Sequence, residues 1–204
     1  MIRRSLVLTW IERSLFAVGA VLAAWSAVTI IEARYFNSLA VPDAGSRSAR
    51  PLLPGESPGD GSRPRSLIAA GTWIARLEAP SVSLAATVVE GSDEQTLSRA
   101  AGHIEQTALP GERGNVGIAA HRDTVFRPVR RLRVGDAIAL TTADRVYRYR
   151  VTNTQIVKPE DVYVLDPKGH PTLTLVTCYP FTFIGQAPLR FVVFADLVEE
   201  DQRF

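Results

Sequence analysis

The chain has 204 residues and a formal net charge of +2, with acidic and basic residues mixed along its length. This charge pattern lacks the clustered basic face of a nucleic-acid-binding protein, so no nucleic-acid partner is expected. The chain contains one cysteine, Cys178, which excludes an intramolecular disulfide and leaves either chemistry or passive packing to explain the thiol.

An apolar stretch near the N-terminus predicts a membrane anchor. Residues 14–31 are uncharged and mostly apolar, and a helix of this length can cross a hydrocarbon core of about 30 Å. Because Arg3, Arg4 and Arg13 lie before the stretch, the positive-inside rule predicts a cytoplasmic N-terminus. We therefore assign residues 1–36 to a cytoplasmic stub and a single-pass anchor in the cell membrane, with a cleaved signal peptide as the alternative.

The composition then separates a linker from a folded domain. Residues 37–66 are rich in Pro, Gly, Ser and Arg, and such a segment buries too little apolar surface to offset its ordering entropy. We expect it to be a disordered tether. Residues 67–204 have the length of one ordinary domain, and we expect a single folded domain there, outside the cytoplasm.

Short apolar segments recur along this domain with short connections between them. They cover residues 73–77, 84–89, 116–120, 137–140, 146–151, 155–157, 173–178 and 191–197. The only clear helical pattern covers residues 93–102, and short helical turns are predicted near 124–132 and 160–165. Many short strands with few helices favour an all-β domain that forms a closed or nearly closed barrel.

The cysteine lies where a strand is predicted to end. Threonine alternates with leucine or valine from Thr172 to Thr177, which is the period of a half-buried strand. Pro180 ends this strand because proline cannot donate to the ladder. Cys178 is therefore expected at the junction of a strand and a loop, where catalytic groups are often placed. A buried thiol without a chemical role is the alternative.

A cysteine nucleophile needs a base or a cationic partner, because the pKa of an ordinary thiol is near 8.5. His121 is the favoured partner, since it also follows an apolar strand directly. The other candidates are His103, at a predicted helix end, and His170, in a predicted turn. Arg190, at the start of the last strand, could stabilise a developing oxyanion or could be an ordinary strand-edge arginine.

Three motifs resemble those of the sortases. The segments 174–178, 117–124 and 187–191 resemble the cysteine, histidine and arginine motifs of that family, in the family's chain order. The similarity extends over most of residues 75–197, and the segments 102–111 and 178–181 are most similar to class D sortases. Ala120 and Ala79 depart from the family pattern, but neither substitution removes a reacting group.

The resemblance implies an eight-stranded sortase barrel and a transpeptidase that cleaves a C-terminal sorting signal of the LPxTG type. It implies that Cys178 is the nucleophile, that His121 is the general acid and base, and that Arg190 holds the substrate backbone or the oxyanion. Substrate-binding roles are assigned to Thr177, Asp123 and Tyr179.

The expected partners are surface proteins that carry the signal and an amine acceptor, which is a cell-wall precursor or a protein lysine. No metal or cofactor is expected. Two other functions remain open at this point: a hydrolytic cysteine peptidase on the same barrel, and a non-catalytic binding barrel tethered to the membrane.

Overall fold

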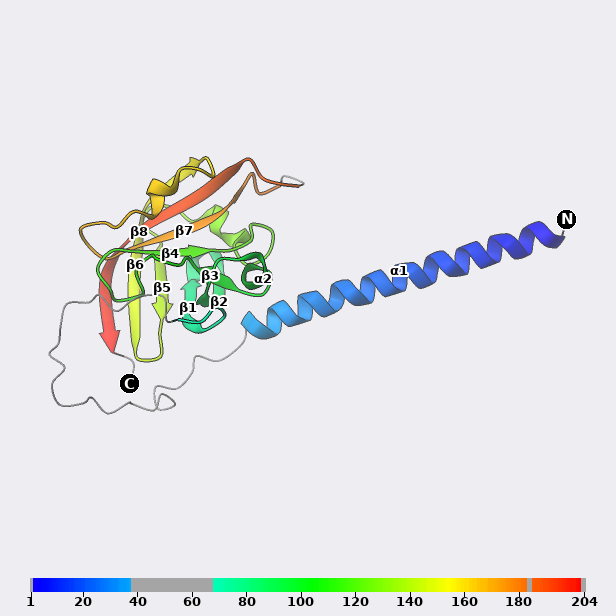
Figure 1. Cartoon of the computed structure of the whole chain (residues 1–204), viewed down its shortest axis with the longest axis horizontal. Coiled ribbons are helices and arrows are strands. Elements are labelled where there is room, and N and C mark those ends of the chain that lie inside the picture. Colours follow the sequence, from blue (N-terminus) through cyan, green and yellow to red (C-terminus); the bar gives the residue numbers. More distant parts are fainter. Residues whose placement is uncertain (1, 38–67, 183–184, 203–204) are drawn as a thin grey trace. The chain divides into compact units, whose positions relative to one another are not determined.

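The computed structural model describes residues 2–37, 68–182 and 185–202, and the chain divides into two compact units, residues 1–38 and 39–204. The first unit contains one helix, α1 (Ile2–Asn37) (Figure 1). The linker predicted for residues 37–66 lies outside the described residues, except for Asn37.

Helix α1 contains the stretch that was predicted to span a membrane, residues 14–31. Large apolar side chains on this helix are exposed, among them Trp10, Phe16 and Trp25. Within the parts of the chain that the structure describes, however, no helix combines the length and the apolar character needed to cross a bilayer. The predicted transmembrane anchor is therefore not confirmed.

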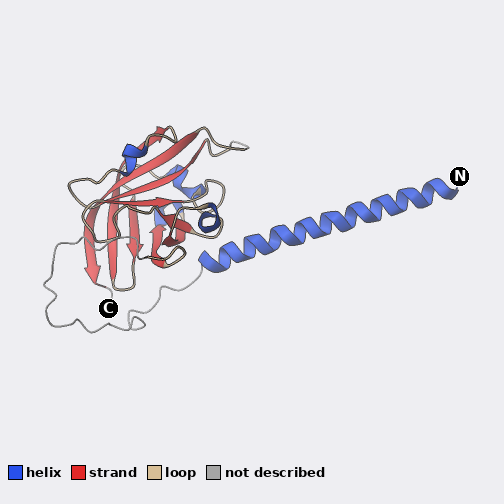
Figure 2. Ribbon diagram, in the orientation of Figure 1, coloured by secondary structure: helices blue, strands red, loops and turns tan. Residues whose placement is uncertain are grey.

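The second unit is a closed barrel of eight strands, which confirms the predicted fold class (Figure 2). The strands are β1 (Trp73–Ala79), β2 (Leu84–Glu90), β3 (Ala101–His103), β4 (Asn115–Ala119), β5 (Ala137–Thr141), β6 (Arg145–Val157), β7 (Thr172–Tyr179) and β8 (Leu189–Gln202). Their order around the barrel is β1-β2-β3-β4-β7-β8-β6-β5, and β5 pairs with β1 to close it. Strands β4 and β7 are parallel, whereas β7 and β8 are antiparallel.

The helical pattern predicted over residues 93–102 extends too far. Helix α2 covers only Glu94–Leu97, and the side chain of Asp93 caps it by accepting a hydrogen bond from the Thr96 amide at 3.1 Å. The chain then enters β3, because pairing with β2 and β4 overrides the local helical preference. Gly102 fits this close pairing, since a Cβ atom there would collide with the carbonyl oxygen of Gly91.

The remaining helical segments are short 3₁₀ turns. They are η3 (Pro80–Val82), η4 (Arg127–Arg131) and η5 (Val162–Leu165), and the last two confirm the predicted helical turns. The two apolar segments predicted at 146–151 and 155–157 belong to one long strand, β6, which bends at two register irregularities along its pairing with β8.

Alternation along β7 sets the two faces of the barrel near its C-terminal end. Leu173 and Leu175 are fully buried and belong to the main core inside the barrel. Val176 instead packs in a smaller apolar cluster on the outer face. Because side chains alternate along a strand, Cys178 lies on the same outer face as Val176.

The outer cluster holds the η5 segment against the barrel. Its buried members are Val157, Val164 and Val192, and Leu165, Val176 and Phe194 pack against them. A polar contact supports this packing: Asn115 on β4 donates through Nδ2 to the Val164 carbonyl at 3.0 Å. Asn115 also accepts at Oδ1 from the Thr174 hydroxyl at 2.8 Å. The η5 segment therefore rests on β4, β7 and β8 through both apolar and polar contacts.

Tyr149→Phe tests how much one buried hydroxyl group lowers the free energy of unfolding. Tyr149 is fully buried, its hydroxyl has no partner among the described residues, and burial raises its pKa above the usual value. Phenylalanine keeps the ring and removes the unsatisfied group, so we expect stability at pH 7 to be unchanged or raised by about 1 kcal/mol.

The same variant predicts a pH effect whose sign follows from the raised pKa of Tyr149. Above about pH 10, tyrosine in the unfolded chain ionises while the buried Tyr149 stays neutral, so the wild type loses about 1.4 kcal/mol per pH unit from this group. Urea unfolding at about pH 7 and pH 11 measures both effects. Equal losses of stability in the two proteins at the higher pH would contradict the account.

Candidate active site

The pairing of β7 with β8 places Cys178 directly opposite Arg190. Directly opposed residues of an antiparallel pair lie on the same face, with Cβ atoms about 5 Å apart. Cys178 is free and partly exposed, and Arg190 is also partly exposed. The thiol and the guanidinium group therefore come from paired positions on β7 and β8, two strands that lie side by side (Figure 1).

The pairing of β4 with β7 brings the ends of these two strands together. The strands are parallel, and Ala119 is opposite Val176. Strand β4 ends at Ala119, so His121 follows it by two residues at the end of the barrel where β7 carries Cys178. The His121 side chain is 31% exposed, so it is open to solvent and to a substrate. The three residues that were predicted to be catalytic thus come from one end of the adjacent strands β4, β7 and β8, and we call His121, Cys178 and Arg190 the catalytic row.

The guanidinium group of Arg190 is anchored at one nitrogen. Its Nη1 donates to the carbonyl oxygens of Ala187 and Leu189, at 3.2 and 3.0 Å. Its Nε and Nη2 groups donate no hydrogen bond to the described residues. A planar donor that is held at one corner and open at the others suits a carbonyl oxygen that gains negative charge.

Thr177 faces the opposite way from Cys178. It is buried, and its hydroxyl donates to the Ala120 carbonyl at 2.7 Å. This bond ties β7 to the chain immediately before His121. The predicted contact between Thr177 and substrate stays a prediction, because the side chain is buried.

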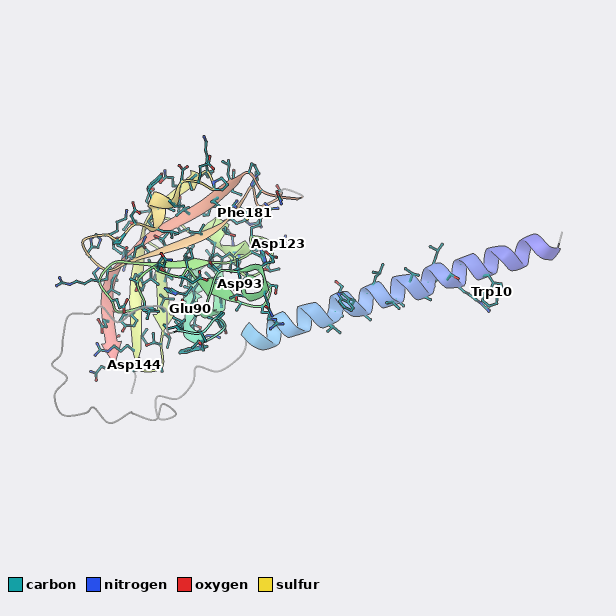
Figure 3. All side chains as sticks on the ribbon, in the orientation of Figure 1. Trp10, Glu90, Asp93, Asp123, Asp144 and Phe181 are labelled. Atoms are coloured by element: carbon teal, nitrogen blue, oxygen red, sulfur yellow. The ribbon has the colours of Figure 1, made fainter. Side chains whose placement is uncertain are left out.

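The other two predicted substrate-binding residues lie on exposed or partly exposed surface. Asp123 is exposed two positions after His121, and Tyr179 is partly exposed next to Cys178. The Tyr179 ring meets Phe181 edge to face, with centroids 6.1 Å apart, and Phe181 meets Phe191 in the same way at 5.4 Å. Figure 3 shows Asp123 and Phe181 near the same end of the barrel. Their contact with substrate also stays a prediction.

The other two histidines lie elsewhere. His103 is buried, with Nδ1 2.7 Å from a Glu90 carboxylate oxygen and Nε2 3.0 Å from the Ala108 carbonyl oxygen, so its ring serves packing. His170 lies in the loop before β7, and its Nε2 is 3.3 Å from a carboxylate oxygen of Asp196. Of the three histidines, His121 is the one that follows β4 at the end of the barrel where β7 carries Cys178.

A carboxylate beside His121 was missed in the sequence analysis. Oε1 of Glu94, the first residue of α2, lies 3.4 Å from Nε2 of His121. A carboxylate at this distance can help to orient the imidazole ring. No local pattern could reveal this contact, because the two residues are 27 positions apart (121 minus 94) and meet only in the folded barrel.

Comparison with known proteins identifies the family. Residues 77–198 match the sortase domain family. Sortase D of Bacillus subtilis is 33% identical over 123 residues, which cover 60% of this chain and 62% of that protein. Sortase SrtE1 of Streptomyces coelicolor is 33% identical over 153 residues, which cover 65% and 42%. The chain thus spans less than two thirds of the length of these relatives.

Solved structures agree with this assignment. A sortase D5 transpeptidase of Clostridium perfringens aligns with a TM-score of 0.60 and 33% identity, covering 66% of this chain and 84% of that one. Sortase E1 of Streptomyces coelicolor, solved with a tripeptide in its active site, aligns with a TM-score of 0.60 and 31% identity, covering 65% and 92%. The chain belongs to the sortase family, whose members are cysteine transpeptidases. The resemblance to sortases, including class D, is confirmed.

Thr177→Val tests whether the bond to Ala120 positions the catalytic row. Valine keeps the shape of threonine but cannot donate, so we expect a loss of about 1 to 3 kcal/mol in the free energy of unfolding. We also expect kcat/KM for peptide cleavage to fall on the order of tenfold, because misplaced reacting groups lower the rate. Thr177→Ser keeps the hydroxyl and is the matched control. If valine and serine gave the same stability and the same rate, the positioning role would be wrong.

Glu94→Gln tests the contact with His121. We expect kcat/KM to fall about two- to fivefold, since exposed ion pairs have weak effects. The loss should shrink at high salt, because salt screens exposed charges. Gln95→Ala, at the exposed neighbouring position, is the control. A loss of activity that does not change between low and high salt, or that Gln95→Ala reproduces, would show that Glu94 acts only through the structure of α2.

Proposed function

We propose that this chain is a cysteine transpeptidase that cleaves an LPxTG-like sorting signal and transfers the product to an amine. The observation that carries the proposal is the register that pairs Cys178 with Arg190, and the parallel pairing of β4 with β7 supports it, since His121 follows β4 at the same end of the barrel. The proposed substrates are surface proteins with a C-terminal sorting signal. The proposed acceptor is the amine of a cell-wall precursor or of a protein lysine.

In the first half of the reaction, the Cys178 thiolate attacks the carbonyl carbon of the threonine in the signal. The carbonyl oxygen becomes an oxyanion, and the open donors of Arg190 stabilise it. The bond from that carbon to the following nitrogen then breaks. His121 gives its proton to the leaving amine, and the peptide remains attached to Cys178 as a thioester.

In the second half, the acceptor amine attacks the thioester carbon. His121 takes a proton from the amine, and the Cys178 thiolate leaves as the new amide bond forms. Glu94, 3.4 Å from the His121 ring, can help to orient that ring in both halves. The partial exposure of Cys178 and His121 leaves the row open to two successive substrates.

Incubation of the protein with a library of sorting peptides, with and without a primary amine, tests the proposal. We expect cleavage between threonine and the next residue, and a peptide–amine conjugate when the amine is present. Cys178→Ala should abolish both products, because only the sulfur supplies the nucleophile. His121→Ala should lower the rate about 10² to 10⁴-fold, the range for loss of a general acid and base.

His170→Ala is the matched control and should cleave like the wild type, because His170 lies in the loop before β7. Cleavage by Cys178→Ala, or loss of cleavage in His170→Ala alone, would contradict the assignment. Hydrolysis without any conjugate, at saturating amine, would indicate a peptidase on the same barrel. Peptide binding without cleavage would indicate a binding protein.

We further propose that the protein is held at the cell membrane, with the N-terminus in the cytoplasm and the catalytic domain outside. The support comes from Arg3 and Arg4 before the apolar stretch and from exposed apolar side chains of α1, such as Trp10 and Trp25. Alkaline extraction of isolated membranes and protease treatment of spheroplasts test this location. Release of the protein by alkali, or a barrel that protease cannot reach, would contradict it.

A further inference from the structure

A hollow of about 350 Å³ lies on the outer face of the barrel, at a distance from the catalytic row. Strands β6, β7 and β8 form its floor, and the segment that carries η5 and continues toward β7 forms its wall. We call it the β6–β8 hollow. Its volume is at the lower end of the range for small-molecule sites in proteins, which suits a ligand of one or two small rings.

The β6–β8 hollow is separate from the catalytic row. Thr172 lines it, and Thr172 precedes Cys178 by six residues on β7, which is roughly 20 Å of extended strand. The outer apolar cluster lies between the two places, since Val164 and Phe194 belong to both the cluster and the hollow, whereas Val176 lies two residues from Cys178. A ligand in the hollow would therefore leave Cys178 free.

The lining combines aromatic rings with amide groups. Gln155 donates through Nε2 to the Tyr163 hydroxyl at 3.0 Å, which fixes the Tyr163 side chain at the rim. Phe194 is held by its packing against the outer cluster. The amide of Asn153, on the floor, forms no side-chain hydrogen bond with the residues that the structure describes. The hollow thus offers fixed ring faces and an open group that both donates and accepts.

The charges of the lining leave one cation without a partner. Asp196 and His170 face each other, with Oδ1 3.3 Å from Nε2. Lys168 lines the same hollow and forms no hydrogen bond or ion pair within the described part of the chain. A carboxylate on a ligand would meet an available ammonium group at this rim.

We propose that the β6–β8 hollow binds a sugar unit and favours a sugar that carries a carboxylate. Sugar hydroxyls both donate and accept hydrogen bonds, as the Asn153 and Gln155 amides do, and the C–H face of a sugar fits aromatic rings. The carboxylate would pair with Lys168. A peptide that adds to a sheet edge is disfavoured, because the barrel is closed and these strands have no free edge.

Saturation-transfer NMR with the full chain and two probes, N-acetylmuramic acid and N-acetylglucosamine, tests the proposal. Only the first probe carries a carboxylate. We expect both to bind, with a dissociation constant of about 1 mM for the acidic sugar, as its small size and the open site imply. Asn153→Ala should weaken both probes severalfold. Lys168→Ala should remove the preference for the acidic sugar, while Lys158→Ala, at an exposed lysine outside the hollow, should leave it unchanged.

The proposal is independent of catalysis, so Cys178→Ala should bind both probes as the wild type does. A sorting peptide should displace neither probe, because it would occupy the catalytic row. The absence of a transfer signal at a probe concentration of tenfold the expected dissociation constant would overturn the proposal. Dissociation constants that neither Asn153→Ala nor Lys168→Ala changes, or displacement of the probe by the sorting peptide, would also overturn it. Binding of N-acetylglutamate as tight as that of the acidic sugar would replace the sugar with an acidic peptide.

Discussion

The catalytic row depends on the register of three adjacent strands. Antiparallel pairing of β7 with β8 sets Cys178 opposite Arg190, and parallel pairing of β4 with β7 brings the strand end before His121 to the same end of the barrel. A slip of one residue in either pairing would turn a side chain to the opposite face and remove it from the row. The buried bond from Thr177 to the Ala120 carbonyl opposes such a slip at the position where it would do most harm.

The outer face of the barrel needs packing contacts of its own, because the core inside the barrel does not contact side chains on that face. The η5 segment supplies part of that support. It packs against Val176 and Val192, which precede Cys178 and follow Arg190 by two residues, and Asn115 ties it to β4. The apolar contacts of η5 with β7 and β8, together with its hydrogen bond to Asn115, limit how far the ends of these strands can move.

Much of the fold could be predicted from the sequence, because the strand ends carry local signals, whereas the roles of His121, Cys178 and Arg190 were predicted from motifs that resemble those of the sortases. The alternation from Thr172 to Thr177 and the stop at Pro180 gave the end of β7, and the apolar run before His121 gave the end of β4. Strand β3 was missed because it has only three residues and continues a helical pattern whose end is set by pairing with β2 and β4.

Contacts between distant segments could not be predicted, since nothing local marks them. Glu94 reaches His121 only when the barrel brings α2 to the end of β4, and the hollow on β6 and β8 forms only when the η5 segment folds over them. The most direct test of the central claim is the mass of the intact protein after acid quenching of a reaction with a sorting peptide. The account predicts a covalent adduct equal in mass to the acyl fragment up to threonine, mapped by digestion to Cys178. A reaction that releases product without this adduct, or an adduct on another residue, would contradict it.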